Sequence, residues 1–181
     1  VGSLVAVALL GFAGRAPGAL AGDTAPASGQ RAVQADARFV DHGIGARVAE
    51  SRGIVTTRTP DGRYLVVANA LDVGPVGYVV VTDVDSGESR QVDCPDDVPQ
   101  GAAFASLLAS TGLFYTAQGG VLVELDPATL TWTYHGRPSS RASNYLSFTE
   151  GPDGVVWAGA VYETTLVSFD PRTRRAVDHG R

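Results

Sequence analysis

The sequence is short of several residue types, and each shortage narrows the possible functions. It contains no lysine, no methionine and one cysteine, so an internal disulfide is excluded and Cys94 is expected to be a half-buried structural thiol. The 14 basic residues are therefore all arginines, and 19 acidic residues outnumber them, which gives a net charge of −5. Because the arginines are scattered along the chain, this balance provides no surface for nucleic acid or for an anionic membrane.

A long hydrophobic run is also missing. The most apolar stretch, residues 4–12, is too short to cross a bilayer. Because Ala19-Leu20-Ala21 follows it, we expect residues 1–21 to form a signal-peptide-like segment; a buried core strand or helix is the alternative. Residues 22–35 are rich in alanine, glycine, serine, threonine and proline and predict a flexible linker. Arginine in place of lysine is typical of a GC-rich bacterium. These features indicate a secreted or extracytoplasmic bacterial protein with no membrane association in its mature form.

A repeated turn dominates the remaining sequence. Five-residue segments start at Asp83, Asp126 and Asp170, 43 and 44 residues apart, and a glycine turn precedes each of them. The aspartate carboxylate can accept hydrogen bonds from backbone N–H groups two residues on, and in the second and third segments a proline sets the first corner. The pattern predicts a tight turn at each position.

Four short strands are predicted in each repeat, because runs of apolar, β-branched and aromatic residues alternate with glycine, proline and aspartate. The expected strands, labelled a to d within a repeat, are residues 54–57, 63–67, 78–83 and 88–92; 104–108, 113–117, 121–125 and 131–134; and 145–149, 155–158, 165–169 and 175–177. Such a unit at this period is typical of a β-propeller blade. We therefore expect an all-β fold in which residues 36–181 form about three four-stranded antiparallel blades and one leading outer strand at residues 39–43.

Three blades are fewer than a closed propeller needs, since closed rings have about 4–8 blades. A blade buries its faces only against its neighbours, so three blades leave two apolar faces open. We therefore expect the chain to be a fragment of a larger propeller, with closure by oligomerisation as the alternative. The start at Val1 and the end at Arg181, directly after an outer strand, agree with a fragment.

The loops between blades supply the candidate ligand-binding residues. Antiparallel alternation places the d-to-a and b-to-c connections on one rim, and the a-to-b and c-to-d turns on the other. Aromatic faces and planar polar groups on the first rim suit a sugar or a peptide. These candidates are Arg137, Arg141, Asn144, Tyr145, Tyr162 and Glu163. A carbohydrate, a small molecule or a protein is the expected partner, and ordinary loop residues without a binding role are the alternative.

All three histidines occupy one position of the repeat, the end of the outer strand. His42, His135 and His179 could act as metal ligands or general bases, because imidazole titrates near neutrality. Outer strands of different blades lie too far apart to share a metal, whose ligand bonds are about 2 Å long. We therefore expect structural hydrogen bonds at these positions and no metal site.

The third repeat carries a resemblance to known proteins. Residues 151–157 (Gly-Pro-Asp-Gly-Val-Val-Trp) and 166–173 resemble a blade of secreted bacterial propellers of the streptogramin-lyase-like, quinoprotein-like and YVTN-repeat families, and residues 79–87 resemble the YVTN or quinoprotein variety. The resemblance implies a fold that hosts many activities. Streptogramin lyases use a histidine and a magnesium site, but the resemblance does not map their catalytic residues onto positions here, so no catalytic role is carried over. Asp126, Thr129 and Trp132 resemble a quinoprotein turn, yet Leu130 replaces its glycine and the tryptophan comes two residues early, so no quinone cofactor is expected.

These observations leave two functions open. The first is an exported recognition or scaffold module, and the alternative is an extracellular propeller enzyme, such as a carbohydrate- or lactone-directed lyase or hydrolase. An enzyme should gather at least two titratable groups with displaced pKa values in the central channel. A binding module should instead present an aromatic and amide-lined rim.

Overall fold

The computed structural model describes residues 50–71, 77–161 and 164–181. The regular secondary structure in this part of the chain consists of β-strands. No helix long and apolar enough to cross a membrane occurs among these residues. The expected signal-like segment, the linker and the leading strand with His42 lie outside the described residues. Tyr162 and Glu163 do as well.

Twelve strands form three separate four-stranded sheets, each built from one sequence repeat. The first sheet contains β1 (Glu50–Arg58), β2 (Tyr64–Leu71), β3 (Gly77–Asp83) and β4 (Ser89–Asp93). The second contains β5 (Ser106–Leu108), β6 (Phe114–Gln118), β7 (Val121–Asp126) and β8 (Thr131–Gly136). The third contains β9 (Tyr145–Glu150), β10 (Val156–Ala160), β11 (Leu166–Asp170) and β12 (Arg175–Asp178).

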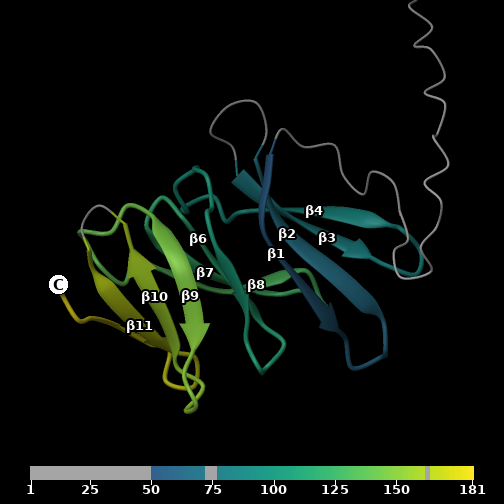
Figure 1. Ribbon diagram of the computed structural model, residues 1–181. Coiled ribbons are helices and arrows are strands. Elements are labelled where there is room, and N and C mark those ends of the chain that lie inside the picture. Colours follow the sequence, from purple (N-terminus) through teal and green to yellow (C-terminus); the bar gives the residue numbers. More distant parts are fainter. Residues whose placement is uncertain (1–49, 72–76, 162–163) are drawn as a thin grey trace, which may run out of the picture. The chain divides into compact units, whose positions relative to one another are not determined.

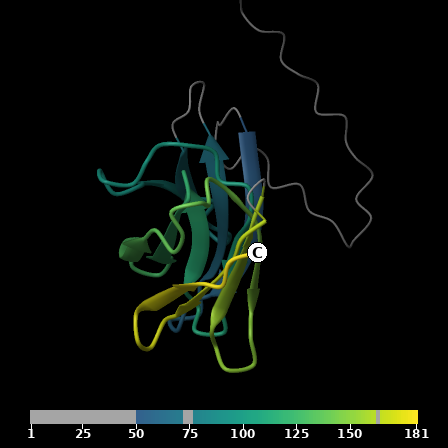
Figure 2. The ribbon, with the colours of Figure 1, turned by 90° about the vertical axis from the view of Figure 1, so that its left-hand side faces the viewer.

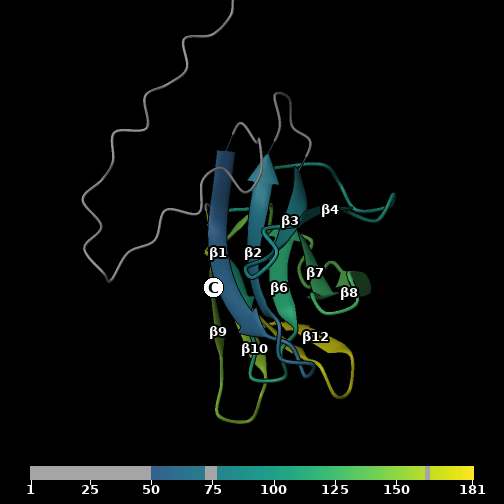
Figure 3. The same ribbon diagram turned by 90° about the vertical axis from the view of Figure 1, so that its right-hand side faces the viewer.

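Each strand pairs antiparallel with the next one along the chain, so strands pair within repeats as the sequence predicted. The innermost strands contact in order, β1 with β5 and β5 with β9, and the second sheet lies between the other two (Figure 1). Seen from the side of the first sheet, β1, β2 and β3 run side by side (Figure 3). The opposite view is from the side of the third sheet, with the β11–β12 hairpin in yellow (Figure 2). All twelve strands predicted from the sequence are present, with ends that shift by a few residues.

The turns repeat in atomic detail. In the a-to-b turns Gly62, Gly112 and Gly154 adopt φ values of 95°, 82° and 77°, a left-handed conformation that glycine adopts without steric cost. In the c-to-d turns the first aspartate accepts a hydrogen bond from the backbone two residues on: Asp83 from Asp85 (3.1 Å), Asp126 from Ala128 (2.9 Å) and Asp170 from Arg172 (3.0 Å). The predicted turn chemistry is therefore confirmed.

The fifth residue of each c-to-d turn is left-handed, although only the first of the three is glycine. Gly87 has φ 71°, and the equivalent Leu130 and Arg174 have φ 58° and 59°. For an L-residue this conformation costs roughly 1–2 kcal/mol. The turn therefore holds Leu130 and Arg174 in a conformation that glycine would adopt without that cost.

The boundary between the first and second sheets, here called the first boundary, is apolar at its centre. Leu65, Val67 and Val81 of the first sheet pack with Phe114 and Leu125 of the second. Further out, the indole N–H of Trp132 donates a hydrogen bond to the carbonyl of Asp93 (2.7 Å). Burial of this apolar surface holds the two blades together.

Cys94 is part of the same boundary, where it packs with Val98, Val121, Val123 and Trp132. It is buried, as the role of a structural thiol requires. Burial raises the pKa of Cys94 to about 11, and the nearby carboxylate of Asp93 acts in the same direction. The thiol is therefore protonated at neutral pH and shielded from solvent.

The boundary between the second and third sheets, the second boundary, contains a fully buried carboxylate. Glu124 is 0% exposed, yet Arg174 Nη1 lies 2.7 Å from its Oε1. The hydroxyl of Thr133 donates to the same oxygen (2.6 Å), and Tyr115 donates to Oε2. The guanidinium of Arg174 also lies over the rings of Tyr134 and Phe169, 5.0 and 5.6 Å from their centroids. The pKa of Tyr115 is raised mainly by burial and also by its hydrogen bond to Glu124. The phenol therefore stays protonated and donates to the carboxylate.

We expect Leu130→Gly to stabilise the protein by up to about 1 kcal/mol, because it removes the cost of a left-handed L-residue while adding glycine's smaller entropy cost. The matched control is Leu146→Gly, which changes an exposed leucine of β9 that does not have a positive φ. Urea unfolding measures both variants. A loss of stability in Leu130→Gly would contradict the expectation.

We expect Arg174→Ala to destabilise the protein by about 3–5 kcal/mol, because it leaves the buried carboxyl group of Glu124 without its ion-pair partner. Arg172→Ala, in the same turn, is the control and should change stability by less than about 0.5 kcal/mol, since its ion pair with Asp170 is exposed. The double variant Glu124→Gln/Arg174→Ala should recover part of the loss. Additive losses in that double-mutant cycle would show that the two residues do not interact.

We expect the Cys94 thiol to react with Ellman's reagent at pH 8 only after unfolding in urea. Because the folded pKa lies above the usual 9.0, the thiol's contribution to stability is complete below about pH 9 and is lost as the pH rises towards about 11. Unfolding midpoints at pH 8 and 10.5 measure this loss, which Cys94→Ala should reduce. Rapid labelling of the folded protein would contradict the burial of the thiol.

Candidate functional site

The connections between strands form two rims. Loops 94–105 and 137–144 join successive sheets and lie on the same side as the turn between β6 and β7; we call this side the loop rim. The a-to-b and c-to-d turns lie on the other side, which we call the turn rim. The candidates chosen from the sequence belong to the loop rim, so their surroundings are described first.

Arg137 fixes the shape of the loop rim between the second and third sheets. Its Nη2 donates to the carbonyl of Gly119 (2.7 Å) and its Nη1 donates to the carbonyl of Ala142 (3.1 Å). Gly119 and Gly120 form a two-residue hairpin with φ 51° and 80°, and a Cβ on Gly120 would lie 2.1 Å from the Ala142 carbonyl oxygen. Arg137 thus clamps loop 137–144 to the β6–β7 hairpin.

Arg141 and Asn144 lie on the clamped loop. Arg141 is exposed, and Asn144 is half-buried with its carbonyl accepting a hydrogen bond from Val161 (3.1 Å). The loop also contacts the outer strand of the third sheet through Asp178. The pKa of Asp178 is lowered first by a hydrogen bond from the Ser139 side chain, then by the backbone of Gly180 and by the charge of Arg141. Asp178 is therefore ionised at neutral pH, and its hydrogen bond with Ser139 holds loop 137–144 against β12.

Tyr145 begins β9 directly after this loop. It is 2% exposed, its ring centroid lies 6.1 Å from that of Phe148, and it packs with Ala117 and Ala142. Burial raises its pKa to about 12, opposed by the charge of Arg137. The hydroxyl has no hydrogen-bond partner within the described part of the chain. A buried hydroxyl without a partner loses its hydration, which lowers the stability of the folded protein.

Four of the six sequence candidates are therefore brought together on one loop and the start of the next strand. Arg137 donates hydrogen bonds to backbone carbonyls, and Arg141 is exposed to solvent. Asn144 is half-buried and Tyr145 is buried. The structure does not describe Tyr162 and Glu163.

Two buried amides on the loop-rim side of the first boundary had no function assigned from the sequence. Gln118 is 1% exposed, and neither its amide oxygen nor its amide nitrogen has a partner among the described residues. Asn69 donates to Thr116 Oγ1 (3.0 Å), but its Oδ1 also has no partner there. A Cβ on Gly77 would lie only 2.5 Å from the Gln118 oxygen, so this glycine leaves room for the amide. The sequence signal is a glutamine that ends an apolar strand directly before Gly119-Gly120.

The two described histidines have different structural partners. His135 Nε2 lies 2.9 Å from Asp97 Oδ2 in the loop that precedes the second sheet. His179 Nε2 lies 2.8 Å from Ser168 Oγ, and its ring stacks on Trp157 with centroids 4.9 Å apart. Each histidine thus ties its outer strand to a neighbouring element, which agrees with the structural role expected from the repeat. No group of three or more His, Cys, Asp or Glu residues that could hold a metal occurs in the described part of the chain.

The turn rim contains carboxylates that titrate below their usual range. The pKa values of Asp83 and Asp170 are lowered chiefly by backbone hydrogen bonds within their own turns, and that of Asp61 by hydrogen bonds from Thr59 and Arg63. These causes are local and structural. They keep the carboxylates ionised without bringing them together as an acid–base pair.

Comparison with known proteins finds similarity in structure but not in sequence. No protein-family model and no curated protein matches the chain. A streptogramin B lyase structure matches with a TM-score of 0.56 and 14% identity, covering 76% of this chain and 43% of the lyase. Selenomethionine-substituted virginiamycin B lyase from Staphylococcus aureus matches with a TM-score of 0.54 and 13% identity, covering 72% and 41%. A catalytically inactive variant of that enzyme with quinupristin gives a TM-score of 0.54 and 12% identity over the same shares.

At this level of identity, the similarity shows the fold alone. The chain spans about two fifths of the length of these lyases. Their architecture is that of a β-propeller, and the three meandering sheets follow the same plan. The described chain is therefore a partial β-propeller of three four-stranded antiparallel blades.

Proposed function

We propose that this chain is part of an exported bacterial β-propeller that recognises a ligand at its loop rim, with a carbohydrate as the ligand class that the residues suit best. Export rests on the signal-like pattern of residues 1–21. The site consists of Arg141, Asn144 and Tyr145. Tyr162 and Glu163, the other two candidates from the sequence, lie outside the described residues. Arg137 is the positioning residue.

One observation carries this proposal: the guanidinium of Arg137 donates hydrogen bonds to two backbone carbonyls of the loop rim. Its hydrogen bonds fix loop 137–144 before any ligand arrives, and a fixed loop lowers the entropy cost of binding. Arg141 is exposed on that fixed loop. A guanidinium donates several hydrogen bonds in one plane, which suits sugar hydroxyls and carboxylates.

The enzyme alternative has less support. An acid–base mechanism needs two titratable groups whose surroundings separate their pKa values. Among the described residues, Asp61, Asp83, Asp170 and Asp178 have lowered pKa values, each caused by hydrogen bonds that hold a turn or a loop. A recognition role accounts for the rim without such a pair.

We expect the full chain to bind saccharides on a glycan array that includes neutral and uronic-acid oligosaccharides, and Arg141→Ala to reduce the signal on the order of tenfold. Arg175→Ala is the matched control, because it changes an exposed arginine of the same blade outside the loop rim. Tyr145→Phe should not lower stability, since it removes only a buried hydroxyl that has no partner in the described chain. Equal binding by Arg141→Ala and the unchanged chain would contradict this site.

A further inference from the structure

The two boundaries between blades use equivalent positions in different ways. Arg174 is the fifth residue of its c-to-d turn, and from there its side chain reaches Glu124 across the second boundary. Leu130 is the fifth residue of the preceding turn and has nearly the same φ, 58° against 59°. The two side chains therefore leave the backbone at equivalent places and with nearly the same φ. Leu130, however, has no cationic group and is 37% exposed.

The residues opposite Leu130 are also smaller. Tyr115 lies three residues after the turn glycine of the second repeat, and Leu65 holds that position in the first. Glu124 precedes the turn aspartate by two residues, where the first repeat has Val81. The first boundary consequently contains a cavity of about 190 Å³ whose lining includes Leu65, Val81 and Leu130. The second boundary has Tyr115, Glu124 and Arg174 at the equivalent positions.

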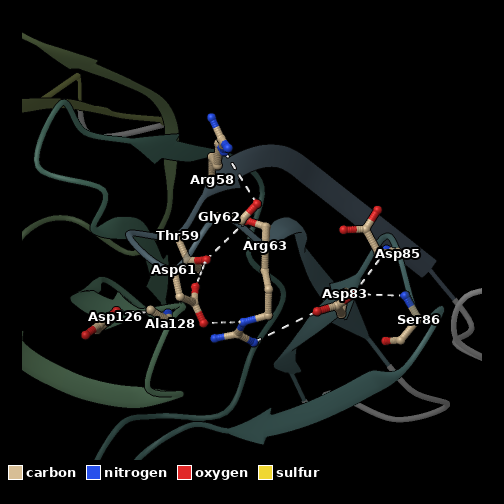
Figure 4. Close-up of polar contacts among 10 residues, drawn as sticks. All are labelled: Arg58, Thr59, Asp61, Gly62, Arg63, Asp83, Asp85, Ser86, Asp126 and Ala128. Carbon is tan, nitrogen blue, oxygen red and sulfur yellow. Dashed lines mark hydrogen bonds and ion pairs between the residues drawn. The ribbon is translucent and has the colours of Figure 1, made fainter.

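Charged side chains surround the mouth of this cavity. Arg63 extends between two carboxylates, with Nε 2.8 Å from Asp61 Oδ2 and Nη1 3.9 Å from Asp83 Oδ2 (Figure 4). Arg90 pairs with Glu88, and both side chains are more than half exposed. Exposed ion pairs of this kind contribute little to stability, so either guanidinium can exchange its partner for another carboxylate. Both arginines line the cavity.

The cavity thus combines an apolar floor with two guanidinium groups at its mouth, where the carboxylates of Asp83 and Glu88 also line it and pair with them. Leu65 and Val81 are 2% and 4% exposed, and Leu130 covers one wall. The volume is smaller than the roughly 300–1,000 Å³ of most small-molecule pockets, so it suits one side chain rather than a larger molecule. Apolar burial would hold the side chain, and a bidentate guanidinium contact would fix an attached carboxylate.

We propose that this cavity binds an apolar amino-acid side chain that lies next to a free carboxylate. The side chain contacts Leu65, Val81 and Leu130, and the carboxylate pairs with Arg63 and Arg90. A free amino-acid derivative and the C-terminus of a polypeptide share this chemistry. The site is on the turn rim and is separate from the loop-rim site proposed above.

Four probes test the proposal with the full chain: N-acetylphenylalanine, its amide, a pentapeptide with C-terminal phenylalanine, and the same pentapeptide amidated. Chemical shifts in ¹H–¹⁵N spectra report binding, and the same spectra report the folding of each variant. We expect saturable binding by an acid probe and none by its amide. Binding by both acids indicates a free amino-acid derivative as a sufficient ligand, whereas binding by the peptide acid alone indicates a protein C-terminus.

Three variants identify the residues responsible. Arg63→Gln and Arg90→Gln should each weaken binding on the order of tenfold, because each removes a charge-assisted contact. Leu130→Arg should abolish binding, because its side chain enters the cavity from the position that Arg174 holds in the next turn. Arg172→Gln, exposed on the c-to-d turn of the third sheet, is the control and should bind normally. The proposal is overturned by equal binding of acid and amide, by no saturable binding of any probe, or by normal binding in the Arg63 and Arg90 variants.

Discussion

The buried ion pair between Glu124 and Arg174 is the constraint that the second boundary depends on. A carboxylate without solvent must be compensated, and here an arginine from the next blade, a threonine hydroxyl and a tyrosine hydroxyl provide the compensation. The partners come from both blades, so the network is complete only when the sheets are docked in one relative position. Apolar packing alone is less directional, because it tolerates small sliding of one sheet over another.

The first boundary reaches a similar arrangement of sheets by other means. Leu65, Val81 and Phe114 supply apolar contact, and Trp132 adds a hydrogen bond to the neighbouring sheet. Smaller residues at the positions of Tyr115 and Glu124 leave a cavity there. The backbone plan is therefore the same in both repeats while the side chains at each boundary differ, so one boundary is filled and the other keeps a cavity.

The sequence revealed most of the fold because turns and strands depend on neighbouring residues. Asp126 accepts from the backbone of its own turn, so the turn could be predicted from five residues. The Glu124–Arg174 pair spans 50 residues, and nothing local links the two. Its signals were a glutamate inside an otherwise apolar strand and an arginine where the turn favours glycine. Arg137 was assigned to the correct loop, but its hydrogen bonds to Gly119 and Ala142 depend on how two connections meet in space.

The outer side of the third sheet carries a further consequence. Trp157 occupies the position of Tyr115, and Ser168 that of Glu124, but there the imidazole of His179 stacks on the indole and bonds the serine. On that side an arginine at the position of Arg174 would face Ser168 in place of a glutamate. The residues at these two positions therefore differ among the three described blades. In a chain of repeated modules, such differences favour one order of docking during folding.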